Sequence, residues 1–153
     1  MILVDTSVLI AYLKNQNIKS VEQFEYILDK SLPYGINTFI YQEVLQGAKT
    51  DKEYNLLKEY FETIPLYHLK YGKESYEQAA LINVKCRQNG ITIRSTIDLL
   101  IAETAIENNL YFLKYELGED VRFNLKIYDL VENILLSTEC YYVYVSGRMN
   151  SAM

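Results

Sequence analysis

Short apolar runs alternate along the chain with longer stretches in which apolar residues recur every three or four positions. The short runs predict strands at residues 2–4, 34–36, 64–66, 110–113 and 125–128. The longer stretches predict helices over residues 8–13, 19–30, 38–47, 51–63, 72–88 and 95–109. Strands that alternate with helices are typical of an α/β sandwich around a parallel sheet, because each helix crosses over between two strands.

Polar, glycine and proline residues define the ends of these elements. Thr38, Asp51 and Ser95 stand where helices begin, and such side chains favour the N-cap position. Asn89-Gly90 ends the helix over residues 72–88 and predicts a left-handed cap. Pro65 has no backbone N–H to donate to a ladder, so the strand around it is expected at an edge of the sheet.

The length of 153 residues suits one compact domain. We expect this domain over residues 1–136, and a C-terminal tail over residues 137–153 that is mobile or vector-derived. Residues 1–15 carry Asp5 where a signal peptide needs a basic start, and no stretch approaches a membrane-spanning length. Two distant cysteines fit a reducing compartment. The expectation is a soluble, cytoplasmic protein with no membrane contact.

The charge balance limits the possible partners and chemistries. Fifteen basic and 20 acidic residues give a net charge of −5, so a broad basic face for nucleic acid is not expected. If nucleic acid binds, a metal ion is the obvious group to hold the phosphate. The single histidine, His68, and the separated Cys86 and Cys140 cannot form a zinc cluster, and His68 lies in an ordinary Leu-Tyr-His-Leu run.

Four carboxylates occupy positions near the ends of predicted elements. Asp5 follows the first strand, and Glu43 lies in the helix over residues 38–47. Asp98 lies in the first turn of the helix over residues 95–109, and Glu116 follows Leu113 by three residues. Ligands of parallel α/β sheets gather at the carboxyl ends of the strands, so these groups can converge there. Each also has a structural explanation, as a helix cap, a capping-box partner of Ser95 or a solvated surface charge.

Convergent carboxylates have a definite electrostatic consequence. Two of them ~4 Å apart repel by about 4 kcal/mol at an effective dielectric constant of ~20. A cleft that holds several such groups therefore takes up protons or binds cations. Because the chain lacks His and Cys ligands in suitable number, all-oxygen coordination favours Mg²⁺ or Mn²⁺ over zinc.

Three segments resemble the PIN-domain family, and in particular the VapC-type toxins of bacterial and archaeal toxin–antitoxin pairs. They are MILVDTSVLI at residues 1–10, YQEVLQG at residues 41–47 and GITIRSTIDLLIA at residues 90–102. The resemblance spans about residues 1–128, with the elements in the expected order. The first and last segments are fairly specific, whereas the glutamate helix alone is a weak signal.

The resemblance implies a Mg²⁺- or Mn²⁺-dependent endoribonuclease on a three-layer α/β/α sandwich with a parallel sheet of about four to five strands. It carries over Asp5, Glu43 and Asp98 as metal ligands, with support from the Thr6 or Ser7 hydroxyl. The sequence departs from the family at the fourth position. The family usually has a His/Asn-Asp-x-Asp-Phe run there, whereas this chain has KYELGE at residues 114–119, which places Glu116 at the first aspartate and Gly118 at the second.

The resemblance also implies an RNA substrate, a cognate antitoxin and a homodimer. Basic residues at positions 85, 87, 94 and 114 can flank an RNA groove or form a solvated face, and most of the 15 tyrosines are expected in the core or at a dimer contact. Two alternatives stay open. One is a catalytically inactive PIN-like module that binds a partner protein, and the other is a small phosphatase or nucleotide-binding domain. The lack of a glycine-rich loop argues against nucleotide binding, and the lack of Asp-x-Asp after the first strand argues against an aspartyl-phosphate mechanism.

Overall fold

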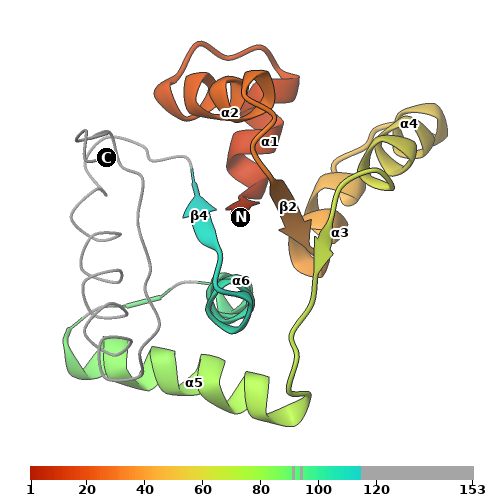
Figure 1. Cartoon of the computed structure of the whole chain (residues 1–153). Helices are drawn as coiled ribbons and strands as arrows, with labels where there is room; N and C mark the ends of the chain where they lie inside the picture. Colours follow the sequence, from red (N-terminus) through yellow and green to blue (C-terminus); the bar gives the residue numbers. More distant parts are fainter. Residues whose placement is uncertain (91, 94, 115–153) are drawn as a thin grey trace.

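The computed structural model describes residues 1–90, 92–93 and 95–114 (Figure 1). The four strands of this part are β1 (Ile2–Val4), β2 (Tyr34–Asn37), β3 (Leu66–Tyr67) and β4 (Tyr111–Leu113). Its helices are α1 (Thr6–Leu13), α2 (Lys19–Asp29), α3 (Thr38–Gln46), α4 (Asp51–Phe61), α5 (Lys73–Gln88) and α6 (Thr96–Asn108). The predicted strand at residues 125–128, the predicted tail, Cys140 and Glu116 lie outside the described residues.

The strands form a parallel sheet in the order β3-β2-β1-β4. Ile2 is opposite both Tyr34 and Tyr111, so β1 lies in the interior of the sheet. This position explains why β1 is a continuous apolar run, since both of its faces are covered. The strand predicted at residues 64–66 is shifted to Leu66–Tyr67, after Pro65, and it lies at the edge of the sheet as predicted. The Pro65 carbonyl accepts the Ile36 N–H at 3.0 Å.

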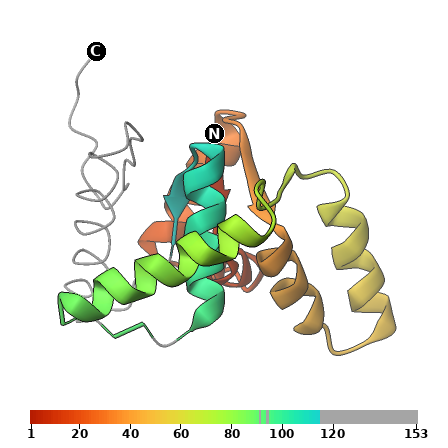
Figure 2. The same ribbon diagram turned by 90° about the horizontal axis from the view of Figure 1, so that it is seen from below.

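The helices cover the sheet on both sides and complete the predicted three-layer α/β/α sandwich. In Figure 1, α1 and α2 lie on one side of the strands, and α5 and α6 lie on the other. Figure 2 shows the long helix α5 passing across α6, while α3 and α4 extend to one end. None of the helices described in residues 1–90 and 95–114 is long and apolar enough to cross a membrane.

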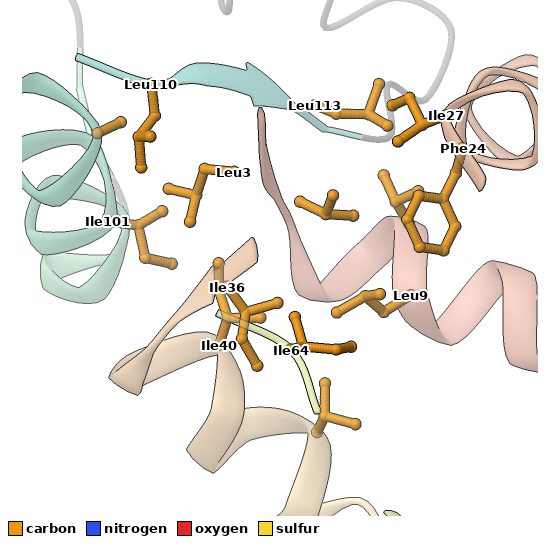
Figure 3. Close-up of a cluster of buried hydrophobic side chains, with 14 of the residues drawn as sticks. Leu3, Leu9, Phe24, Ile27, Ile36, Ile40, Ile64, Ile101, Leu110 and Leu113 are labelled. Carbon is orange, nitrogen blue, oxygen red and sulfur yellow. The ribbon is translucent and has the colours of Figure 1, made fainter. Parts of the chain in front are cut away.

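The core lies between the sheet and the two helical layers (Figure 3). Leu3 and Ile36 from the strands, Leu9 and Phe24 from α1 and α2, and Ile101 from α6 are at most 2% exposed. Burying each of these side chains contributes roughly 1.5–3 kcal/mol relative to leaving it in water. The core therefore fixes the strand ends from which the candidate site residues project.

Two predicted helix starts are wrong by one residue. Asn37 caps α3 in place of Thr38, because its side chain accepts the Ile40 N–H at 2.9 Å. Thr50 caps α4 in place of Asp51, since its hydroxyl accepts the Glu53 N–H at 3.1 Å. Both residues have the extended backbone that an N-cap requires, whereas the residue after each is already helical.

Other predicted ends are confirmed. The Ser95 hydroxyl caps α6 and accepts the Ile97 N–H at 3.2 Å. Gly90, just beyond α5, has a φ of 74°, and Asn109 ends α6 in the left-handed region with a φ of 52°. Glycine and asparagine tolerate this conformation at low cost, so both helices stop at these residues.

Candidate active site

The carboxyl edge of the parallel sheet carries the first candidate residue. Asp5 follows β1 directly, is 7% exposed and forms the N-cap of α1. Its Oδ2 atom accepts the Ser7 backbone N–H at 3.1 Å and also accepts the Ser7 hydroxyl. Asp5 therefore has the capping role that was one of its two explanations. A capping bond to one carboxylate oxygen leaves the role of a metal ligand possible, because Oδ1 is a second acceptor.

A hydrogen bond connects this strand end with the second candidate residue. The Thr6 hydroxyl, in the first turn of α1, donates to Glu43 Oε2 of α3 at 2.5 Å. The contact spans 37 positions of the sequence and joins two helices that pack against each other. Glu43 is therefore hydrogen-bonded to Thr6, the residue that follows Asp5 in the chain. A hydrogen bond to a carboxylate is short and strong, so it fixes the orientation of Glu43.

Asp98 lies in the first turn of α6 and is exposed. The predicted capping box is only half present, because the Ser95 hydroxyl accepts the N–H of Ile97, the second helical residue. A carboxylate at this end of a helix interacts favourably with the positive end of the helix dipole. Among the described residues, none donates a hydrogen bond to the Asp98 carboxylate.

Within residues 1–90, 92–93 and 95–114, no three acidic, histidine or cysteine side chains form a group that could hold a metal ion. The structure brings Glu43 to the residue that follows Asp5, and it does not bring Asp98 into one cluster with them. Glu116 lies outside the described residues. Among the described residues, the candidate carboxylates therefore do not form one group.

Comparisons with known proteins identify the fold family. A family model described as the PIN domain matches residues 2–117. The chain belongs to the PIN-domain family. The match covers Asp5, Glu43, Asp98 and Glu116, so all four candidate carboxylates lie inside the PIN domain. A comparison with curated proteins finds no match.

Solved structures share the fold at low sequence identity. VapBC-1 from nontypeable Haemophilus influenzae is 17% identical, with a TM-score of 0.61 over 94% of this chain and 98% of that chain. A toxin–antitoxin complex from Klebsiella pneumoniae is 17% identical, with a TM-score of 0.59 over 79% and 91% of the two chains. FitAcB from Neisseria gonorrhoeae is 24% identical, with a TM-score of 0.54 over 73% and 85%. At these identities the similarity is one of fold.

The donor chemistry of the PIN domain fits a hard divalent cation. Asp5, Glu43 and Asp98 offer carboxylate oxygens and Thr6 a hydroxyl oxygen, which are the ligand types that Mg²⁺ and Mn²⁺ prefer. Two of these carboxylates already accept hydrogen bonds from hydroxyl groups, so they are held in one orientation. The residues fit such an ion in their chemistry.

The basic candidates lie at two places around the PIN domain. Lys114 follows β4 directly, at the carboxyl edge of the sheet, and is partly buried. Lys85 and Arg87 lie in the last turn of α5, where Arg87 is exposed. Arg94 lies outside the described residues.

Two buried polar residues behind the carboxyl edge are not among the predicted site residues. Asn37, the last residue of β2, is fully buried, and Thr104 of α6 is 1% exposed. Asn37 Nδ2 donates to Thr104 Oγ1 at 3.3 Å. The signal in the sequence is an asparagine directly after an apolar strand, which favours a helix cap, and a threonine on the apolar face of the α6 segment.

Proposed function

We propose that this PIN domain is a Mg²⁺- or Mn²⁺-dependent endoribonuclease and the toxin of a VapBC-type toxin–antitoxin pair. The observation that carries the proposal is the link from Thr6 to Glu43 beside the buried Asp5, at the carboxyl edge of the sheet. Ligands of parallel α/β sheets gather at this edge, and both carboxylates have a hydroxyl group that fixes one of their oxygens. The family membership and the toxin–antitoxin complex of similar fold support the same assignment.

In this proposal Asp5, Glu43 and Asp98 hold the ion, and Glu116 is the fourth ligand. A bound Mg²⁺ or Mn²⁺ supplies an activated water and counters the charge that develops on the scissile phosphate. Thr6 holds Oε2 of Glu43, which leaves Oε1 as the second acceptor of that carboxylate. The Ser7 N–H holds Asp5 in the same way, so neither carboxylate must reorganise during the reaction.

The proposed partner is a cognate antitoxin. The described helices expose large apolar side chains, among them Tyr54, Leu56 and Tyr60 on α4, that suit an apolar or aromatic segment of a partner. An arginine of that partner fits two carboxylates with its planar fork and can take the place of an ion in the acidic site. We also propose that the toxin is a homodimer, on the basis of the family resemblance.

A second candidate function is a catalytically inactive PIN-like module that binds a partner protein. It is favoured by the absence of a three-carboxylate group among the described residues, and by Gly118 at the second aspartate position of the family motif. The two candidates share a fold and differ in metal binding and cleavage.

The test compares single variants on one labelled RNA with Mn²⁺ present and after EDTA treatment. We expect Asp5→Asn and Glu43→Gln to lower the cleavage rate by roughly 100-fold or more, because each removes a charged ligand. Asparagine still caps α1, so Asp5→Asn keeps the fold. Without metal it should gain slightly in stability, because the substitution removes one of several like charges. Glu25→Gln, an exposed change on α2, is the matched control and leaves cleavage unchanged.

The alternatives give different outcomes in the same experiment. Cleavage that survives in both Asp5→Asn and Glu43→Gln contradicts the assigned ligands. A wild-type protein that cleaves no RNA and takes up no Mn²⁺, yet binds the product of the neighbouring small reading frame, supports the inactive module.

A further inference from the structure

A buried amide–hydroxyl contact joins the two helices that carry Glu43 and Asp98. Asn37, at the start of α3, is fully buried, and its Nδ2 atom donates to Thr104 Oγ1 of α6 at 3.3 Å. The Thr104 hydroxyl in turn donates to the Leu100 carbonyl at 2.7 Å, and Asn37 Oδ1 accepts the Ile40 N–H at 2.9 Å. The contact spans 67 positions of the sequence and connects β2 and α3 directly to α6.

The chemistry of this contact needs both residue types. Asparagine has an acceptor and a donor on one short side chain, so it caps α3 with its oxygen and reaches α6 with its nitrogen. Aspartate or serine caps the helix equally well and lacks the second arm. Threonine supplies an oxygen that accepts from Asn37 while its own proton goes to the helix carbonyl. The network has one consistent direction, from Asn37 through Thr104 to Leu100.

The place of the contact relates it to the candidate ligands. Glu43 lies six residues after Asn37, on the helix that Asn37 caps, and Asp98 lies six residues before Thr104 on α6. The helices α3 and α6 also pack against each other. Carboxylates on two separate helices can share an ion only if the helices are held within about 0.5 Å of the productive spacing. Thr6 fixes Glu43 relative to α1, and the tie between α3 and α6 adds a constraint on the helix that carries Asp98.

We propose that Asn37 and Thr104 are positioning residues that set the spacing of Glu43 and Asp98 and thereby the affinity of the PIN domain for a divalent cation. This inference rests on the proposed function, because it takes both carboxylates as ligands. Neither Asn37 nor Thr104 touches the ion. Their hydrogen bond ties α6 to the start of α3 and so limits how far Asp98 can move relative to Glu43.

The experiment measures Mn²⁺ binding by electron paramagnetic resonance or titration calorimetry, separately from RNA cleavage. Thr104→Val has nearly the same shape and no hydroxyl, and we expect it to raise the Kd for Mn²⁺ by about 10-fold, the usual effect of losing a group that orients ligands. Thr104→Ser restores the hydroxyl and should return the Kd to within about 2-fold of wild type. Asn37→Ser keeps a cap on α3, loses the donor, and is expected to weaken Mn²⁺ binding like Thr104→Val.

The matched control is Val21→Ala on α2, a core change away from both helices. It lowers the unfolding temperature and is expected to leave the Kd for Mn²⁺ unchanged. A wild-type Kd in Thr104→Val and Asn37→Ser overturns the inference, and so does a Val21→Ala protein that loses Mn²⁺ as strongly as they do. A wild-type protein that binds no Mn²⁺ overturns the proposed function itself, so the two failures are distinguishable.

Discussion

Among the described carboxyl groups, the side chain of Glu103 has the most unusual environment. It is 4% exposed on α6, and burial together with the nearby Glu107 carboxylate raises its pKa from 4.5 to about 7. Glu107 Oε2 accepts the Lys70 backbone N–H at 2.5 Å, and its Oε1 is buried without a partner in the described part of the chain. A protonated Glu103 is neutral and can donate a hydrogen bond to the Glu107 carboxylate.

The raised pKa predicts a pH dependence of stability. Folded Glu103 holds its proton up to about pH 7, whereas the unfolded chain releases it near pH 4.5. The stabilising contribution of the Glu103 proton is therefore fully present below pH 4.5 and is lost as the pH rises toward and through 7. The unfolding free energy falls by roughly 3 kcal/mol over this range. We expect Glu103→Gln, which stays neutral, to gain on wild type by this amount between pH 4 and pH 8 in urea unfolding.

An exposed acidic residue provides the comparison for this measurement. Glu22→Gln on α2 should change stability by the same small amount at both pH values. If the difference in unfolding free energy between wild type and Glu103→Gln does not change with pH, the pKa of Glu103 is not raised in the folded protein.

The predicted ligand role of Glu116 is a further question at the residue scale. Glu116 follows Leu113 of β4 by three residues, and one extra methylene relative to aspartate lengthens its reach by about 1.5 Å. If it is a ligand, Glu116→Gln slows cleavage and raises the metal requirement much more than Glu119→Gln does. Both variants belong in one titration of cleavage rate against Mg²⁺ concentration. Equal and small effects would leave Asp5, Glu43 and Asp98 as a centre of three carboxylates.

At the scale of elements, the edge strand β3 depends on a glycine in its neighbour. A Cβ atom on Gly35 of β2 would lie 2.5 Å from Tyr67 Cε2 and 2.6 Å from the Pro65 carbonyl oxygen. The Pro65 oxygen belongs to the backbone that pairs with Ile36, so it cannot move without breaking the ladder. Close approach of the two strands therefore requires glycine at this position.

We expect Gly35→Ala to lower the unfolding free energy by about 1–3 kcal/mol through overpacking. Chemical unfolding monitored by circular dichroism gives this number directly. Gly47→Ala is the control, because Gly47 has an ordinary φ of −75° and its new Cβ would meet its nearest atom at 3.2 Å. A Gly35→Ala protein as stable as Gly47→Ala would show that β3 tolerates displacement.

Most elements follow from local sequence patterns, and their ends follow less well. The strands at residues 2–4 and 111–113 and the helices α5 and α6 match the apolar runs and repeats of the sequence. The starts of α3 and α4 were misplaced because two polar residues stand in succession, Asn37-Thr38 and Thr50-Asp51, and either can cap a helix. Only the backbone conformation decides between them.

At the scale of the whole molecule, the candidate site divides into a local part and a long-range part. The position of Asp5 after β1 follows from the sequence, because a parallel strand must end at the carboxyl edge of the sheet. The bond from Thr6 to Glu43 and the contact of Asn37 with Thr104 link residues 37 and 67 positions apart. Such pairings depend on how helices pack, and a single sequence does not specify which side chains meet.

The net charge of −5 leads to a prediction about how the whole molecule holds RNA. A protein with a basic face that neutralises about 6–10 phosphates loses about 10³–10⁵ in affinity between 50 and 200 mM salt. This chain is acidic overall and has Lys114 at the carboxyl edge of the sheet, so its contacts with phosphate are expected to run mainly through the metal site. We therefore expect kcat/KM at fixed Mn²⁺ to fall by less than about 10-fold over this range of KCl.

Lys114→Ala tests the source of the salt dependence that remains. Because it removes one phosphate contact, it should reduce the slope of log(kcat/KM) against log[KCl] by about 1, while Lys52→Ala on the exposed face of α4 leaves the slope unchanged. A fall of about 1,000-fold in wild-type kcat/KM would mean that a basic surface holds the RNA. Such a result would overturn the expectation that the metal site carries most of the contact with phosphate.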